Sequence, residues 1–287
     1  MSGSLDYTTL GQALPESCGV CVINLSHRKD RWEDFQQNML PHLAPLEVHR
    51  IPAVEGIRLP GFGLPPFFRG RPRDKTWAAR AGCTLSHRAA LLHAHAACWS
   101  HVLVLEDDIQ MPLLPDPKSL FDLRVALESL DPDICYLGFT DPVSPFRELR
   151  CLGANRALHQ VFGCNTAHAY IVSKRAIVHL LEILPQPEDI WHWLTRHRAV
   201  DRFYYRNLSP TLTVTAVSPS LIEQKPGFSD IIGRNVTVHS EMHKTTIDSH
   251  HPDPRDYEKH LVCRASTFTR QYRIDFIRGW WKSIRGF

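Results

Sequence analysis

The sharpest chemical signal in the chain is a run of three acidic residues, Glu106, Asp107 and Asp108, which we call the acidic triplet. It follows HVLVL (101–105), an apolar run typical of a buried strand. In open α/β sheets, ligands bind beyond the carboxyl ends of the strands. Adjacent carboxylates at such a place repel one another unless a cation lies among them. Because Mg²⁺ and Mn²⁺ prefer carboxylate and phosphate oxygens, the acidic triplet predicts a divalent-metal site able to bridge the protein to a diphosphate.

The alternation of side chains along a strand separates the roles of the three acids. Glu106 and Asp108 should point to one side and Asp107 to the other. We therefore expect Glu106 and Asp108 at the metal, with Asp108 as the main ligand. Asp107, or Glu106, would take a second metal position or a sugar hydroxyl. The alternative is an acidic loop in water.

Polar side chains after a first apolar run, GVCVINL (19–25), could bind the phosphates of a ligand. Arg28 and Arg31 carry the fork of donors that grips phosphate oxygens, although a solvated helix face explains them nearly as well. Asn24 could hydrogen-bond a base or ribose, or shape the turn. His87 lies at the expected start of a helix, in GCTLSH, where free N–H groups favour anions. A histidine in that place is also often a structural hydrogen-bond partner.

The elements that must position these residues follow from the hydrophobic pattern. Apolar runs and periodic stripes alternate along the chain and predict an α/β fold with a mostly parallel sheet flanked by helices. Ser26 is expected to cap the first helix, over 26–39. Leu92 is expected to lie on the buried face of the second helix, which should begin at Leu85. The Gly- and Pro-rich stretch 57–80 predicts no regular element. Strands are expected at 19–25, 48–56, 101–110, 133–138, 168–172 and 211–219, and helices over 26–39, from Leu85, near 120–130 and after Ser173.

Composition narrows the class of protein. The chain has 287 residues, with a formal net charge of +3, which is too balanced for a protein that coats nucleic acid. It contains no apolar run near the roughly 20 residues that span a bilayer. No secretory signal is evident at the N-terminus, and the eight cysteines are scattered. We therefore expect a cytoplasmic protein that does not bind nucleic acid.

Several motifs together resemble glycosyltransferase family 25. INLSHRKDR, IPAVEG, AGCTLSH, VLVLEDD, NTAHAY, IVSKRA and PSLIEQKPGFSDI follow one another in that family's order, over residues 20 to about 232. The resemblance implies a Rossmann-related GT-A fold with a mixed, mostly parallel sheet. It also implies a UDP-sugar donor, most often UDP-galactose, a Mn²⁺-type metal (or Mg²⁺) at the acidic triplet, and inversion at the anomeric carbon. Asn24, Arg28, Arg31 and Glu55 fall in motifs similar to those that bind the donor.

Transfer with inversion needs a carboxylate that takes the proton from the acceptor hydroxyl. Asp201, in AVDRFYY, and Asp230 are the preferred candidates, with Glu188 and Asp189 as further ones. We expect the enzyme to move a hexose, galactose by the resemblance, to a glycan of the lipopolysaccharide or lipooligosaccharide type. The alternatives are transfer to a protein or peptide, and a non-catalytic module that only binds nucleotide sugars.

The C-terminal part of the chain differs from the rest. We expect a transferase domain over 1–240 and an extension over 241–287. Residues 264–287 carry a net charge of +5, and their apolar positions cluster on one side of a helical projection. This pattern predicts an interfacial helix on an anionic membrane surface, which fits peripheral attachment to the inner face of the cell membrane and a lipid-linked acceptor. The alternative is a helix packed on its own domain.

Overall fold

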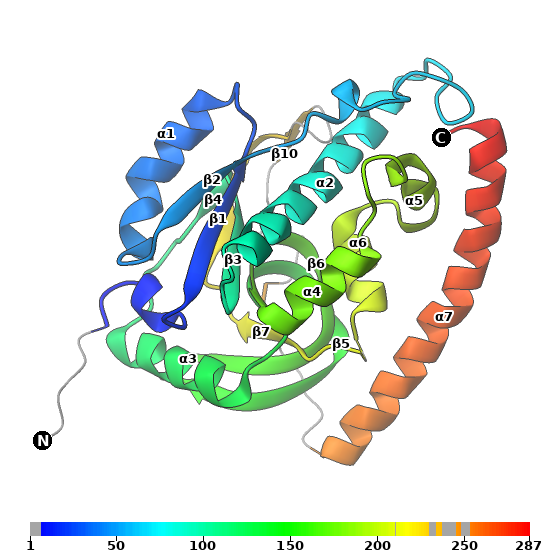
Figure 1. The fold of residues 1–287 in the computed structure, drawn as a ribbon. Helices are drawn as coiled ribbons and strands as arrows, with labels where there is room; N and C mark the ends of the chain where they lie inside the picture. Colours follow the sequence, from blue (N-terminus) through cyan, green and yellow to red (C-terminus); the bar gives the residue numbers. More distant parts are fainter. Residues whose placement is uncertain (1–6, 210, 230–233, 237–244, 248–252) are drawn as a thin grey trace, which may run out of the picture.

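The computed structural model describes residues 7–209, 211–229, 234–236, 245–247 and 253–287. Its centre is a six-stranded sheet in the order β2-β1-β3-β6-β5-β7 (Figure 1). β1 pairs in parallel with β2 and β3, and β5 pairs in parallel with β7, whereas β6 is antiparallel to its neighbours. The mixed, mostly parallel α/β sheet predicted from the sequence is therefore confirmed. The strands are β1 (Cys18–Asn24), β2 (Val48–Pro52), β3 (His101–Glu106), β5 (Ile134–Leu152), β6 (Arg156–Ser173) and β7 (Val214–Ser218).

Helices cover both faces of the sheet, which is why its central strands are apolar on both sides. All seven residues of β1 are buried. α1 (Lys29–Asn38) and α3 (Pro117–Leu130) pack on one face, where Phe35 and Leu120 join the core. α2 (Asp74–Ala96), α4 (Lys174–Ile183) and α6 (Val200–Asn207) pack on the other, where Leu91 and Ile177 lie. As predicted, the Ser173 side chain caps α4 by accepting from the Ala176 N–H group.

Two strands are much longer than the sequence pattern predicts. β5 has 19 residues and β6 has 18, so the expected strands at 133–138 and 168–172 are only parts of them. The two form a hairpin, and β6 contacts β3 near its end and β7 near its start. The added length of β5 is mostly half-buried and pairs with β6 alone, whereas the added length of β6 is largely buried and also pairs with β7.

Three local predictions are wrong. Ser26 does not cap α1, which begins at Lys29 with Arg28 in the N-cap position. α2 begins at Asp74, so the end of the 57–80 stretch is helical. Leu92 is 44% exposed, because α2 turns a neighbouring stripe that includes Leu91 toward the sheet.

Short elements complete the fold. β4 pairs with β8 directly after β3, and β9 pairs with β10. α5 lies between α4 and α6 in the chain. Their bounds are β4 (Ile109–Gln110), β8 (Glu223–Gln224), β9 (Gly227–Ser229), β10 (Arg234–Val236), α5 (Ile190–His197), and the 3-10 turns η1 (Gly11–Ala13), η2 (Leu40–Leu43) and η3 (Gly56–Arg58).

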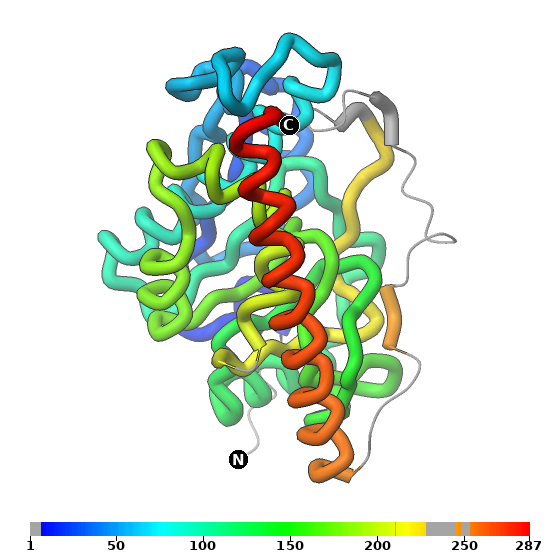
Figure 2. The backbone as a smooth tube through the Cα atoms, turned by 90° about the vertical axis from the view of Figure 1, so that its right-hand side faces the viewer, coloured from blue at the N-terminus to red at the C-terminus, as the bar shows by residue number. Residues whose placement is uncertain are grey.

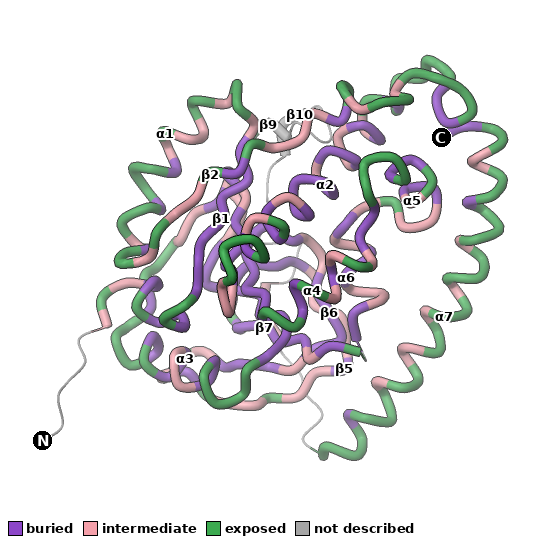
Figure 3. The backbone as a smooth tube through the Cα atoms, viewed as in Figure 1, coloured by how far each residue is buried: buried purple, intermediate pink, exposed green. Residues whose placement is uncertain are grey.

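The C-terminal region forms one long helix, α7 (Pro254–Arg285), which runs along one side of the molecule (Figure 2). Arg206 of α6 pairs with Asp275 of α7 at 2.8 Å, and the Phe287 ring stacks on Trp77 at 4.4 Å between centroids. Much of α7 is nevertheless exposed, unlike the strands (Figure 3). Among the described residues, no helix is both long enough and apolar enough to span a bilayer.

Candidate functional site

The acidic triplet lies where β3 ends, beside the end of β1. In the parallel pairing of these strands, Ile23 faces Glu106, so Asn24 comes next to Asp107. Asp107 and Asp108 occupy the turn between β3 and β4. The pairing of β4 with β8 fixes this turn, and the Lys225 N–H group donates to the Asp108 carbonyl oxygen at 2.7 Å. The predicted place of the acids, at a carboxyl edge of the sheet, is thus what the structure has.

Asn24 holds Asp107 rather than facing a ligand. It is 1% exposed, and its Nδ2 donates to Asp107 Oδ2 at 2.5 Å. Its Oδ1 accepts from Arg50 Nε at 2.9 Å. From α1, Arg31 donates to Asp107 Oδ1 at 2.9 Å and to Asp108 Oδ2 at 3.3 Å. Burial raises the pKa of Asp107, against the opposing effect of Arg31 and of the Asn24 hydrogen bond.

Asp108 is the acid whose environment disfavours its charge most. Burial, followed by the charge of Glu106, raises its pKa to about 7, although Arg31 opposes the shift. Its Oδ1 is buried, and within the described residues it has no hydrogen-bond partner. A buried carboxylate oxygen without a partner costs free energy, and a hard cation would satisfy it. Asp108 therefore fits the ligand role that the sequence predicts.

Glu106 is held from both sides. Its Oε1 lies 3.3 Å from His87 Nε2, and Gln224 donates to its Oε2 at 3.3 Å. Burial opposes the charge of Glu106, but the hydrogen bond and charge of His87, together with the charges of His168 and Arg31, outweigh burial, so the pKa of Glu106 is lowered. His87 Nδ1 in turn lies 2.8 Å from the Tyr170 hydroxyl. Glu106 is thus kept as a carboxylate in a fixed orientation.

His87 does not lie at the start of a helix, although the sequence predicts that it does. Since α2 begins at Asp74, His87 lies inside the helix, and the expected anion site at a helix start around Gly82 does not exist. His87 is 1% exposed and both ring nitrogens face protein groups. It therefore orients Glu106, which agrees with the alternative that His87 is a structural hydrogen-bond partner.

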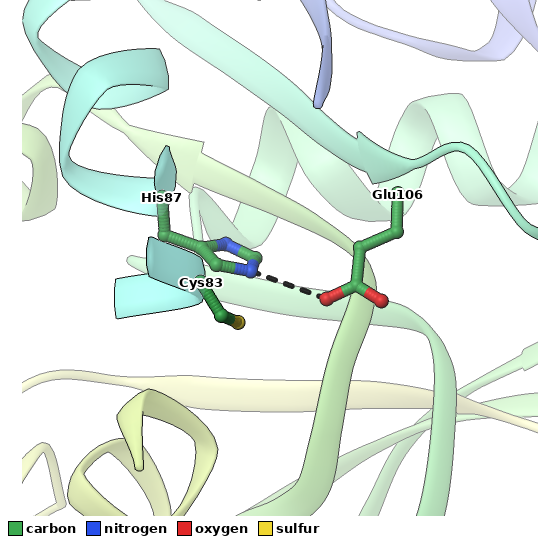
Figure 4. A group of neighbouring side chains, drawn as sticks. All are labelled: Cys83, His87 and Glu106. Carbon is green, nitrogen blue, oxygen red and sulfur yellow. Dashed lines mark hydrogen bonds and ion pairs between the residues drawn. The ribbon is translucent and has the colours of Figure 1, made fainter. Parts of the chain in front are cut away.

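Cys83, His87 and Glu106 form a second group that could hold a metal, with ligand atoms within 4.8 Å of one another (Figure 4). A thiolate and an imidazole would suit zinc better than Mn²⁺ or Mg²⁺. However, burial, with the charges of nearby acids, raises the pKa of the Cys83 thiol well above its ordinary value. The unpartnered oxygen of Asp108 therefore makes the acidic triplet the better metal site.

Two cavities meet at the acidic triplet. The larger has a volume of about 530 Å³ and reaches α1, α6 and β8. The smaller, about 330 Å³, reaches the ends of β1 and β2 and has an apolar wall that includes Ala53 and Ile57. Residues that line both are Arg31, Cys83, the acidic triplet and Gln224.

The structure brings most of the remaining candidates to these cavities. Glu55 lines the smaller cavity and pairs with Arg58 at 3.1 Å. Arg28 and Asp201 line the larger one. Asp230 lies outside the described residues. The further base candidates Glu188 and Asp189 line neither cavity.

Several polar residues that line the larger cavity are not among the site residues predicted from the sequence, and they include Arg80, Arg202, Gln224 and Lys225. Arg80 was assigned to an irregular stretch but belongs to α2, and Arg202 follows Asp201 in α6. Gln224 and Lys225 belong to the quoted segment PSLIEQKPGFSDI, and that motif was the available signal. Arg80 and Arg202 have no local pattern that marks them as part of a site.

Comparison with known proteins gives little further information. No family model matches the chain, and no curated protein matches it. A solved structure, "Crystal Structure of A197 from STIV", aligns at a TM-score of 0.35 and 10% identity, over 70% of this chain and 83% of that chain. A similarity this low carries no argument about activity. The fold and the site themselves define a mixed α/β protein of Rossmann-like type with a carboxylate site at the strand ends.

Proposed function

We propose that this chain is a metal-assisted glycosyltransferase of the family 25 type, which transfers galactose from UDP-galactose to a glycan hydroxyl. The observation that carries the proposal is the unpartnered, buried oxygen of Asp108 at the junction of two cavities. A donor that consists of a nucleoside, a diphosphate and a sugar needs such a site. The apolar wall of the smaller cavity suits a nucleoside, and the larger cavity has room for two sugars.

Asp108, with Glu106 beside it, would hold Mn²⁺ or Mg²⁺. When bound, the metal neutralises phosphate oxygens and so favours departure of UDP. Arg31 lies at the same junction and carries further positive charge for the diphosphate. His87 and Gln224 keep Glu106 in position, and Asn24 does so for Asp107.

Asp201 is the proposed general base. It accepts the proton of the acceptor hydroxyl while that oxygen forms a bond to the anomeric carbon. The bond from this carbon to the phosphate oxygen breaks at the same time, and its electron pair leaves with UDP. Because attack and departure occur on opposite sides of the sugar ring, the configuration inverts. Asp201 lines the same cavity as the acidic triplet, as this reaction requires.

The acceptor is proposed to be lipid-linked, with α7 as the membrane contact. Ile274, Ile277, Trp281 and Ile284 are each between 46% and 59% exposed. Exposed basic residues flank them, including Arg270 and Arg278. An apolar stripe beside basic side chains suits an anionic lipid surface. Sedimentation with phosphatidylglycerol vesicles should remove the protein from solution, whereas Ile277→Glu combined with Trp281→Glu should abolish this. Equal binding of both proteins would contradict the membrane role.

Thermal denaturation with a panel of nucleotide sugars, with and without Mn²⁺, tests the proposed donor. A ligand that binds only the folded state raises the melting temperature. UDP-galactose should raise it in the presence of Mn²⁺, with little effect after EDTA treatment. Stabilisation by a non-uridine nucleotide alone, or equal stabilisation without metal, would contradict the proposal.

A further inference from the structure

Three arginines near Asp201, namely Arg80, Arg198 and Arg202, have no role in the transfer reaction proposed above. Arg80 of α2 and Arg202 of α6 line the larger cavity, and Arg198 lies between α5 and α6. Burial, then the charge of Arg198 and also that of Arg202, lowers the pKa of Arg80. Burial, followed by the charge of Arg202, also lowers the pKa of Arg198. The three guanidinium groups are therefore close enough to repel one another.

Local acids offset these charges only in part, through Asp201, whose negative charge opposes the lowering of the Arg80 pKa. Within the described part of the chain, no carboxylate forms a close ion pair with Arg80, Arg198 or Arg202. Arg80 instead lies over the Trp77 ring, 5.1 Å from its centroid. Asp275, which is near Arg198, already pairs with Arg206 at 2.8 Å. Arg80 and Arg202 are half-buried, whereas Arg198 is exposed. Neighbouring cations that repel one another are stabilised by an anion, and arginine is well suited to bind phosphate or carboxylate.

The position of the arginines separates this anion from the donor. The diphosphate of the proposed donor belongs at the acidic triplet, where Arg31 already lies. In an inverting transfer the base and the leaving group are on opposite sides of the donor sugar. Groups that surround Asp201 therefore contact the acceptor and not the diphosphate.

We propose that the acceptor carries an anionic group close to the hydroxyl that is glycosylated, and that Arg80 and Arg202, assisted by Arg198, bind this group. The inference rests on the proposed transferase function and adds the class of acceptor. An acidic sugar and a phosphorylated sugar provide the same oxygen chemistry. Both would sit with the anion on the arginines and a neighbouring hydroxyl at Asp201.

Binding of inorganic phosphate to the full chain saturated with Mg²⁺ and UDP is the direct test. Calorimetry should detect a phosphate site that remains when UDP is bound. The double variant Arg80→Gln/Arg202→Gln should weaken phosphate binding at least tenfold and leave UDP affinity unchanged. Arg80→Lys, which keeps the charge, should retain part of it. Arg255→Gln, at an exposed position of α7, is the matched control and should bind phosphate as the wild type does.

Transfer assays identify the source of the anion. Glucose, glucose 6-phosphate and glucuronic acid serve as minimal acceptors, and one of the two anionic sugars should exceed glucose at least tenfold in kcat/KM. The double variant should lose this preference, mainly through KM. Phosphate that binds only by displacing UDP, or equal use of all three sugars by the wild type, would overturn the inference. Failure of UDP to bind at all would instead contradict the proposed function.

Discussion

The Asn24 amide donates to the Asp107 carboxylate across 2.5 Å, and this hydrogen bond ties the end of β1 to the turn after β3. The Oδ1 atom of the same side chain accepts a hydrogen bond from Arg50, a residue of β2. One buried residue thus connects three neighbouring strands at the edge where the acidic triplet lies. The position of the acids depends on this connection as much as on β3 itself.

Replacement of Asn24 by alanine should therefore weaken both the fold and the site. Asp107, which is buried, would lose a hydrogen-bond partner, and Arg50 would lose a half-buried hydrogen bond, which together cost about 2 kcal/mol of unfolding free energy. Urea denaturation at pH 8 measures this loss, and UDP affinity in Mn²⁺ should fall with it. Asn38→Ala, which removes an exposed hydrogen bond to Asp34, is the control and should change stability by less than about 0.5 kcal/mol. Equal effects of the two variants would contradict the assignment.

Asp108 should reduce the stability of the metal-free protein at neutral pH. Its pKa of about 7 in the folded protein lies above the ordinary value of 3.8. The folded state therefore binds more protons between these values, and the unfolding free energy falls as pH rises from about 4 to 7. Asp108→Asn, measured in EDTA at pH 8, should be about 1–3 kcal/mol more stable than the wild type. A less stable variant would show that the charged carboxylate has a compensating partner.

His197 should produce the opposite dependence at acidic pH. Burial, then the charges of Arg196 and Arg206, lowers its pKa from 6.5 to about 4. The unfolded state then binds more protons between pH 4 and 6.5, so stability is lost as pH falls through this range. In His197→Gln the loss between pH 7 and pH 4.5 should be smaller by about 2 kcal/mol. Denaturation curves at the two pH values test this, with the exposed His95→Gln as a control that should behave as the wild type does.

Phe287 should anchor the end of α7. It is 2% exposed and packs against Trp77 and Phe68, and its main-chain oxygen accepts from Arg71 and Arg73. Phe287→Ala should lower the unfolding free energy by about 3 kcal/mol and increase hydrogen exchange in the last turns of α7. Trp280→Ala, at a side chain that is 56% exposed, should have little effect on stability. If both variants retain wild-type stability, Phe287 does not hold the helix.

Local sequence predicted the elements whose structure depends on local hydrophobicity. The apolar runs of β1 and β3 and the stripe of α4 are examples. The distal part of β5 is only partly buried, and pairing with β6 maintains it, whereas the added part of β6 is largely buried. The start of α2 was missed because Gly70 and Pro72 directly precede it, which reads as a loop. Pairing between strands therefore explains the unexpected strand length, and the residues that precede α2 explain why its start was placed too late.

The candidate site was predictable only where one segment contains its chemistry. The acidic triplet is continuous in sequence, so its place at a strand end followed from the pattern. Arg80 and Arg202 are far apart in the chain, and only the packing of α2 against α6 brings them to one cavity. The buried role of Asn24 likewise depends on Asp107 and Arg50, which are distant in sequence.

Calorimetric titration of Mn²⁺ and UDP into the wild type and Asp108→Asn tests the central claim most directly. The wild type should bind UDP with Mn²⁺ present, and its Mn²⁺ affinity should fall as pH drops below 7, because Asp108 must lose a proton to coordinate a metal. Asp108→Asn should lose at least tenfold in Mn²⁺-dependent UDP affinity, whereas Asp189→Asn, outside both cavities, should bind as the wild type does. Undiminished Mn²⁺-dependent UDP binding by Asp108→Asn would contradict the account.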